Sequence, residues 1–342
     1  MTFQQGNSHL SIAVTMVAAV CVLAASAFGQ DNITITSPHS NTTYSYPVTV
    51  AATFSGCGSS STGFGYSVNS SPFITWGQTD LTINNTDYRL TPGTYATIRF
   101  KGWSGSTLCE ADATNVTITG PDTTTASNIE DDPTSDWTYV HDTGTSGTAS
   151  GTTTLVTGSP CQDSQCREFT MSFTDGGGMR GSISFGTDES ATNFVYDTYV
   201  YVTDPSSLAN LEMDNNQVWD SSNDVLIYGT QCASNGYWEY TTNDSGAHWN
   251  ISTVKCEGGP PKWQSDYWHH VQIKAHRDGS GNAYYDSVTL DGVTSQLNDS
   301  GFSSFALDWN PNGDLVLNFQ MDGNGSSGSV TAYVDGLTEI YW

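Results

Sequence analysis

Residues 209–219 read Ala-Asn-Leu-Glu-Met-Asp-Asn-Asn-Gln-Val-Trp, and they alternate apolar with polar side chains. Successive side chains of a β-strand point to opposite faces. Leu211 and Met213 therefore share one face, and Glu212 and Asp214 share the other. The first face is suited to a core, whereas the second is a row of short polar groups. This pattern predicts a two-sheet β domain that presents the polar row on its surface.

Similar alternation recurs about every ten residues from Arg167 onward, and no amphipathic helix interrupts it. Short strands at this spacing are typical of a large sandwich or jelly roll, so we expect an all-β fold. In the strand near residue 318, the polar side chains of Asn318, Gln320 and Asp322 share one face. The expected strands are Glu168–Thr174, Gly181–Phe185, Phe194–Val202, Leu208–Asp214, Val225–Thr230, Tyr237–Thr241, His248–Ser252, Trp268–Arg277, Ala283–Leu290, Leu315–Met321 and Val330–Tyr341.

The sequence predicts a separate β unit over residues 30–120, a polar linker over 121–127 and the jelly roll over 128–342. In the first unit, Val48, Val50, Ala52 and Phe54 alternate as in a strand. The phrases Ile35-Thr-Ser-Pro38, Gly93-Thr-Tyr95 and Phe100-Lys-Gly-Trp103 resemble those of bacterial immunoglobulin-like domains, which implies a small sandwich. Thr143–Gly158 is nearly all Gly, Ser and Thr and is expected to be a loop.

The N-terminus favours export. An apolar run, Leu10–Ala27, ends in small residues before Gln30, as in a signal peptide over residues 1–29. No Lys or Arg precedes the run, so an uncleaved anchor is the alternative. We expect a secreted or cell-surface protein without membrane contact once the signal is cleaved. The formal charge of −26, from 9 Lys+Arg and 35 Asp+Glu, argues against nucleic acid and favours a neutral or cationic ligand.

Six cysteines remain after such a cleavage, and an even number in an exported protein indicates disulfides. Six cysteines allow 15 pairings. Proximity in the sequence and the division into domains favour Cys57–Cys109, Cys161–Cys166 and Cys232–Cys256.

The second domain resembles the concanavalin A-like lectin and glucanase superfamily, a jelly roll whose concave sheet holds glycans. Trp268-His-His-Val271 is similar to a strand of the back sheet, and Thr331-Ala-Tyr-Val-Asp-Gly-Leu-Thr338 to the closing strand. Leu211-Glu-Met-Asp-Asn-Asn-Gln217 resembles the catalytic strand of laminarinase-type retaining glucanases. The resemblance implies that Glu212 is the nucleophile and Asp214 its helper.

The acid/base glutamate of those glucanases would fall at Asn216 or Gln217, and both are amides. An amide cannot donate and then accept the proton that retaining hydrolysis requires. Its absence shifts the expectation from cleavage to binding, unless another residue, such as His270, Asp322 or Glu239, supplies the proton.

The remaining candidate residues are ligand contacts and a metal site. Aromatic faces stack on sugar rings, and amides hydrogen-bond to hydroxyls. The expected ligand-binding residues are Asn216, Trp219, Tyr228, Gln231, Trp238, Trp249, Gln320 and Asp322. Jelly-roll carbohydrate modules often bind calcium where the first and last strands meet, which suggests a structural Ca²⁺ held by Glu130, Asp132 and Asp335.

The sequence therefore predicts an exported protein that binds an extracellular polysaccharide or other glycan. A laminarinase-like glycoside hydrolase is the first alternative. A polysaccharide lyase is a weaker one, because a strongly acidic domain suits polyuronates poorly. A structural or adhesive surface protein without a sugar site is the third.

Overall fold

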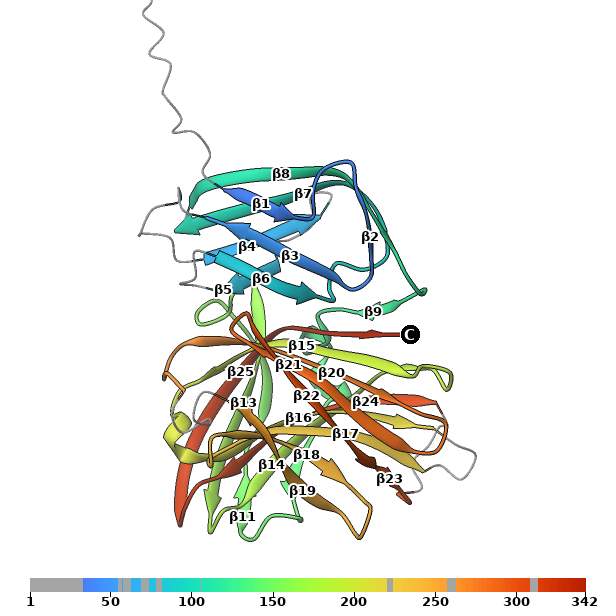
Figure 1. Ribbon diagram of the computed structural model, residues 1–342. Helices are drawn as coiled ribbons and strands as arrows, with labels where there is room; N and C mark the ends of the chain where they lie inside the picture. Colours follow the sequence, from blue (N-terminus) through green and yellow to red (C-terminus); the bar gives the residue numbers. More distant parts are fainter. Residues whose placement is uncertain are drawn as a thin grey trace, which may run out of the picture.

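A computed structural model describes residues 33–54, 57, 63–68, 74–77, 82–104, 106–219, 224–256, 263–307 and 313–342. Residues 1–29, the predicted signal peptide, lie outside this range. The described residues form β-strands and three short 3₁₀ helices, η1 (Ile129–Asp131), η2 (Thr134–Asp136) and η3 (Pro205–Ser207), without an α-helix. None of the helices among them is long and apolar enough to cross a membrane. The predicted all-β fold is confirmed, and Figure 1 shows it as two stacked units.

The first unit is a sandwich of two sheets around its own core. One sheet has the order β1-β3-β6 and the other β2-β8-β7-β4-β5. Val48, Val50 and Phe54 are at most 1% exposed, as their alternation predicts. The Cys57–Cys109 disulfide lies at the edge of this core. The strands are β1 (Thr34–Ser37), β2 (Thr43–Ser45), β3 (Val48–Thr53), β4 (Gly63–Val68), β5 (Ile74–Gly77), β6 (Thr82–Asp87), β7 (Gly93–Ser104) and β8 (Ser106–Thr119).

The second unit is a larger sandwich with an eight-stranded and a nine-stranded sheet in the described residues. The eight-stranded sheet runs β10-β14-β24-β16-β17-β18-β19, and β23 pairs with β17. Its strands are β10 (Thr138–Asp142), β14 (Gly178–Thr187), β16 (Leu208–Val218), β17 (Val225–Ala233), β18 (Tyr237–Thr242), β19 (His248–Lys255), β23 (Ser304–Phe305) and β24 (Asp314–Gly323).

The nine-stranded sheet runs β11-β13-β25-β15-β20-β21-β22, with β12 beside β13 and β9 beside β25. Its strands are β9 (Thr124–Ala126), β11 (Thr148–Ser150), β12 (Thr153–Thr157), β13 (Gln165–Thr174), β15 (Asn193–Val202), β20 (Trp268–Arg277), β21 (Asn282–Leu290), β22 (Val293–Phe302) and β25 (Ser327–Tyr341).

The apolar faces of the two sheets form the core. Leu211 and Met213 on β16 pack in the same cluster as Val271 and Ile273 on β20. Full burial of one such side chain contributes about 1.5–3 kcal/mol. Because this apolar face must stay inside, the register of β16 is fixed, and its polar face points away from the core.

Two segments that the sequence predicts to be irregular contain β-strands. The expected loop Thr143–Gly158 contains β11 and β12, which both pair with β13. Threonine is a good strand former, and the ladder satisfies its backbone groups without an apolar pattern. The expected linker 121–127 contains β9, which pairs with Glu339–Tyr341 of β25. The connection between the units is thus part of the second sandwich.

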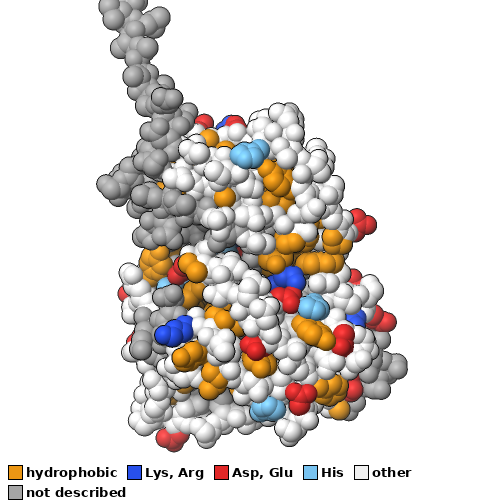
Figure 2. Space-filling view, in the orientation of Figure 1, with side chains coloured by type: hydrophobic (Ala, Val, Ile, Leu, Met, Phe, Trp, Pro, Cys, Tyr) orange, Lys and Arg blue, Asp and Glu red, His pale blue; other side chains and the backbone are white. Residues whose placement is uncertain are grey.

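The first unit packs on the outer face of the nine-stranded sheet, which lies below the first unit in Figure 1. Phe194 and Tyr196 of β15 enter the core, so Val195 and Asp197 point outward. Val195 packs with Tyr88 of the first unit. Arg89 Nη1 lies 3.4 Å from Asp197 Oδ1. The side chains on the face shown in Figure 2 are mostly uncharged, with scattered ionic groups.

Candidate functional site

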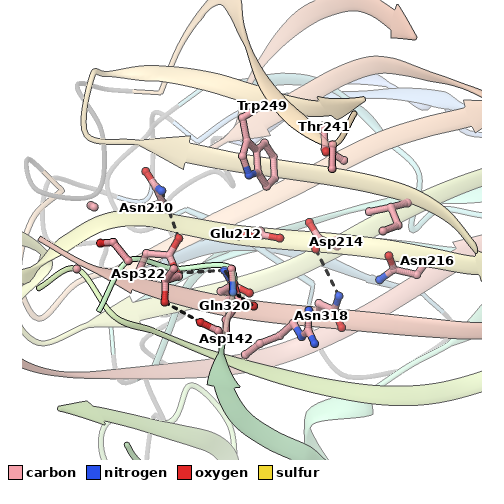
Figure 3. Close-up of a pocket in the computed structure, with 18 of the residues that line it drawn as sticks. Asp142, Asn210, Glu212, Asp214, Asn216, Thr241, Trp249, Asn318, Gln320 and Asp322 are labelled. Carbon is pink, nitrogen blue, oxygen red and sulfur yellow. Dashed lines mark hydrogen bonds between the residues drawn. The ribbon is translucent and has the colours of Figure 1, made fainter. Parts of the chain in front are cut away.

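A cleft of about 550 Å³ lies on the outer face of the eight-stranded sheet (Figure 3). Its floor is the polar face of β16, with Glu212, Asp214 and Asn216 in sequence. This sheet is the one that the first unit does not cover. The row predicted from residues 209–219 therefore lines a cleft.

The register of the neighbouring strands widens the polar row. Glu212 pairs with Gln320 of β24, and Asp214 pairs with Asn318. One strand further, Arg180 of β14 pairs with Gln320. All five residues line the cleft. The polar floor is thus made by three adjacent strands of one rigid sheet.

A hydrogen-bonded network fixes one end of this floor. Gln320 Nε2 donates to Asp142 Oδ2 and to Asp322 Oδ1, both at 3.1 Å. Asn210 Nδ2 donates to Asp322 Oδ2 over 3.3 Å. Figure 3 shows the four side chains together beside Glu212. The carboxylates of Asp142 and Asp322 are therefore held in place by shared amide donors.

The other end of the floor is organised around Asp214. The backbone N–H of Thr230 donates to Asp214 Oδ1 at 3.2 Å, and Asn318 Nδ2 donates to Oδ2 at 3.4 Å. Asn216 Nδ2 donates to the Val316 carbonyl oxygen at 3.2 Å. Because a carbonyl oxygen and an ionised carboxylate accept only, both amides are oriented with Nδ2 toward these partners.

This orientation leaves buried acceptors without a partner. Asn216 Oδ1 and Asn318 Oδ1 have none, although the two residues are 0% and 4% exposed. Arg180 Nε is a buried donor without a partner. An unsatisfied buried polar group costs about 1–3 kcal/mol. Such atoms in the lining of a cleft are the expected feature of a site that a polar ligand completes.

Burial governs the acidity of the carboxyl groups. It raises the pKa of Glu212 well above its usual range, and the neighbouring Asp214 adds to the shift. Burial also raises the pKa of Asp214, although Glu212, Asn318 and Arg180 oppose the shift. For Asp322, burial raises the pKa to about 6. Burial thus opposes ionisation of all three carboxyl groups.

Two glycines give these carboxyl groups room. A Cβ on Gly178 would lie 2.1 Å from Asp322 Oδ1. A Cβ on Gly229 would lie 2.6 Å from Thr241 Cγ2 and 3.2 Å from Asp214 Oδ1. The absence of a side chain at both positions keeps the polar floor open.

The predicted aromatic contacts have mixed outcomes. Trp249 of β19 is partly exposed and lines the cleft, at its upper side in Figure 3. Trp238 and Tyr228 are 1% and 2% exposed in the core, so their assignment to a ligand is wrong. Their strands alternate, and both side chains lie at inward positions.

Trp219, another predicted ligand contact, is not among the residues that line the cleft and has a structural role. Its indole packs against the core and donates to Ser304 Oγ at 3.1 Å. The guanidinium carbon of Arg277 lies 5.6 Å from its ring centroid. Gln217, one of the two amides at the expected acid/base position, faces inward and donates to the carbonyl oxygen of Asp188. Asn216 is therefore the residue that follows Asp214 on the cleft face.

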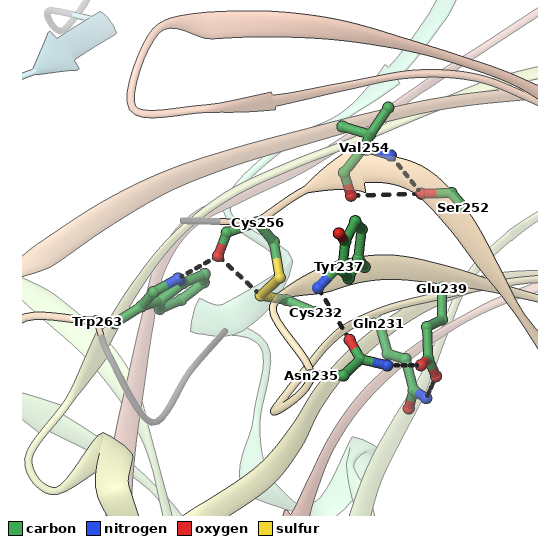
Figure 4. Close-up of a disulfide and its surroundings, with 9 residues drawn as sticks. All are labelled: Gln231, Cys232, Asn235, Tyr237, Glu239, Ser252, Val254, Cys256 and Trp263. Carbon is green, nitrogen blue, oxygen red and sulfur yellow. Dashed lines mark hydrogen bonds between the residues drawn. A yellow bond between two sulfur atoms is a disulfide. The ribbon is translucent and has the colours of Figure 1, made fainter. Parts of the chain in front are cut away.

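Gln231 and Glu239 extend the polar face beyond Glu212. Gln231 pairs with Glu212 on one side and with Glu239 on the other. Its Nε2 donates to Glu239 Oε2 at 2.6 Å, while its Oε1 is buried without a partner. Figure 4 shows this pair next to the Cys232–Cys256 disulfide. All three expected disulfides are present.

His270 is not part of the cleft, so its assignment as a proton donor there is wrong. It lies on β20 of the opposite sheet, where Nε2 is 3.2 Å from Asp197 Oδ2. Its ring stacks on Tyr199 at a centroid distance of 4.6 Å. The alternation of β20 points it outward, but the sheet is the one beneath the first unit.

The residues proposed for calcium have protein partners. Glu130 Oε1 and Oε2 accept the N–H groups of Gly336 and Leu337 at 2.6 and 2.9 Å. Asp335 Oδ2 accepts from the Gln162 N–H at 2.7 Å. Asp132 is exposed. No group of three His, Cys, Asp or Glu side chains suited to a metal is found in the described part of the chain. Calcium binding stays a prediction.

Of the amide and charged residues that line the cleft, the sequence does not by itself assign Asp142, Arg180, Asn210 and Asn318 to the site. Asn318 shares its face with Gln320, so the same alternation indicates it. Arg180 and Asp142 reach the cleft because β14 lies next to β24 in the sheet and β10 lies next to β14. Strand order of this kind is not encoded in local patterns.

No family model matches this chain, and a search of curated proteins also finds no match. Solved structures do match. One is a carbohydrate-binding module of the β-sandwich superfamily described for promiscuous specificity, with 14% identity, coverage of 90% of this chain and 96% of that chain, and a TM-score of 0.35.

Two further matches cover the greater part of this chain. The family 11 carbohydrate-binding module from Clostridium thermocellum, in complex with a β-1,3-1,4-mixed-linked tetrasaccharide, has 11% identity, coverage of 63% and 94%, and a TM-score of 0.29. Lectin UEA-II in complex with galactose has 10% identity, coverage of 64% and 97%, and a TM-score of 0.30. Because these scores are low, the functional proposal depends on the chain's own residues.

Proposed function

We propose that this chain is an exported glycan-binding protein that holds an extracellular polysaccharide in the cleft above β16. The observation that carries the proposal is the set of buried, unpartnered acceptors, Asn216 Oδ1 and Asn318 Oδ1, in a cleft bordered by Trp249. Sugar hydroxyls would donate to the acceptors, and a pyranose ring would stack on the indole. A rigid sheet that presents such groups in advance lowers the cost of ordering them on binding.

Further features support the finer parts of this proposal. The three disulfides are typical of proteins that fold outside the cytoplasm, in agreement with a signal peptide over residues 1–29. Two-sheet sandwiches in both units agree with an immunoglobulin-like domain followed by a concanavalin A-like jelly roll.

The test is glycan binding by the intact mature chain and by Trp249→Ala. We expect binding to at least one polysaccharide, and a loss of about tenfold or more in affinity in the variant. Tyr284→Ala, which removes a partly exposed aromatic side chain from β21 of the other sheet, is the control and should bind normally. Absence of binding to every glycan on an array, or equal binding by Trp249→Ala, would refute the proposal.

Glycoside hydrolysis is the second candidate, and the adjacent carboxyl groups of Glu212 and Asp214 favour it. A carboxyl group with a raised pKa beside a second carboxyl is the usual arrangement of an acid catalyst. Release of reducing sugar from β-glucans by the parent chain, abolished in Glu212→Gln, would establish this activity. If neither protein releases sugar while both bind the glycan, the cleft is a binding site only.

A further inference from the structure

The cleft has more carboxyl groups and other acceptors than cationic side chains and free donors. Among the residues that the structure describes, four carboxyl groups line it, those of Asp142, Glu212, Asp214 and Asp322, and Arg180 is the one cationic side chain. Glu212 and Asp214 are 8% and 3% exposed. Buried carboxylates are stable when a cation and hydrogen-bond donors surround them.

The donors within the cleft are already engaged at one end. The amide of Gln320 serves both Asp142 and Asp322, and the amide of Asn210 serves Asp322 again. The unpartnered oxygens of Asn216 and Asn318 add further acceptors, and both side chains are more than nine-tenths buried. In the described part of this lining, Arg180 Nε is the single buried donor without a partner. A complementary ligand must therefore bring donors and positive charge.

We propose that the cleft selects glycans that carry free amino groups, such as polymers of glucosamine. This inference rests on the proposed glycan-binding function and names its substrate class. A protonated amine supplies three donors and one positive charge, whereas a hydroxyl supplies one donor and no charge. The amine lies against Asp142, Glu212 and Asp322, and the ring hydroxyls serve the two asparagine oxygens.

The same charges exclude other sugars. A uronate or a sulfated sugar would place a further anion among the four carboxyl groups, which is unfavourable at these separations. An N-acetylated sugar has the same ring but no charge on nitrogen. It would leave the carboxyl groups without a cation, so it should bind more weakly than its deacetylated counterpart.

The experiment compares chitosan oligosaccharides with fully N-acetylated chito-oligosaccharides of equal length, with cello-oligosaccharides as neutral reference. Titration calorimetry with the mature chain should give at least about tenfold tighter binding of the chitosan oligomer, since a charge-assisted hydrogen bond contributes about 1.5–3 kcal/mol. Added salt should weaken that binding and leave the neutral oligomers nearly unaffected.

Asp322→Asn and Asp142→Asn should each reduce the preference for the amine-bearing oligomer. Circular dichroism verifies that each variant is folded, and Asp122→Asn, at an exposed site, is the control. Equal or tighter binding of the acetylated or neutral oligomers, or an unchanged preference in both cleft variants, overturns this inference but leaves glycan binding intact. Binding of no oligosaccharide or polysaccharide at all overturns both.

Discussion

At the scale of the residue, Asp322 shows that a carboxyl group buried in the cleft reduces the stability of the fold when it is ionised. Burial raises its pKa to about 6, so the folded protein holds the proton more strongly than the unfolded chain. This contribution to stability is fully present below the ordinary pKa of an aspartate, about 4, and is lost as the pH rises through about 6. We therefore expect the melting temperature to fall between about pH 4 and pH 7.

Asp322→Asn should remove this part of the pH dependence. The amide keeps the shape of the side chain and has no charge to bury, so the variant should melt at a higher temperature than the parent at pH 8 and near the parent at pH 4. Thermal unfolding across this range checks the expectation, with exposed Asp122→Asn as control. A variant that loses stability equally at both pH values would show that Asp322 is stabilised as the carboxylate.

At the scale of the element, Gly229 on β17 determines whether the floor of the cleft is open. A Cβ there would lie 2.6 Å from Thr241 Cγ2 and 3.2 Å from Asp214 Oδ1. We expect Gly229→Ala to cost about 1–3 kcal/mol of stability through overpacking, and to weaken glycan binding by displacing Asp214. Denaturant unfolding and calorimetry measure the two effects.

Gly279→Ala is the matched control, because a Cβ at Gly279 has no atom within 4 Å. It should leave stability and binding unchanged. Parent-like binding by Gly229→Ala, in a protein that is otherwise folded, would mean that Asp214 takes no part in the site.

The strands also show what sequence alone can predict. Alternation in residues 209–219 was sufficient to orient Glu212 and Asp214 outward, because period-two patterns specify faces. The same rule places Trp238 and Tyr228 inside, although aromatic side chains are also common in sugar-binding sites. β11 and β12 have no apolar alternation in their sequence. They are recognised as strands only by their pairing with β13.

At the scale of the whole molecule, strand order and domain docking could not be predicted. Arg180 and Asp142 enter the cleft through neighbours that lie more than a hundred residues away in sequence, since β14 pairs with β24. His270 lies in a pattern that fits either sheet. The contacts between the units include the ion pair of Arg89 with Asp197. No local sequence pattern predicts that these two residues meet.

These contacts make the first unit a fixed base for the second. Arg89 Nη2 lies 2.9 Å from Asp87 Oδ2, and Nη1 lies 3.4 Å from Asp197 Oδ1 and 3.3 Å from the hydroxyl of Tyr199. The side chains of Asp87 and Asp197 are 2% and 1% exposed. Tyr46 packs edge-on against Trp342 nearby, at 5.4 Å between centroids. The cleft faces away from this interface, on the other sheet.

We expect Arg89→Ala to separate the units without closing the cleft. The change leaves two buried carboxylates without their cation, which costs about 3–5 kcal/mol. We expect one thermal transition for the parent and two for the variant, and X-ray scattering should show a larger radius of gyration for the variant. Arg99→Ala is the control, because its ion pair with Asp112 is exposed and contributes about 0–1 kcal/mol. Glycan affinity should persist in both variants, because the cleft lies on the opposite sheet. An Arg89→Ala protein with one transition and unchanged scattering would show that the aromatic contacts alone hold the two units together.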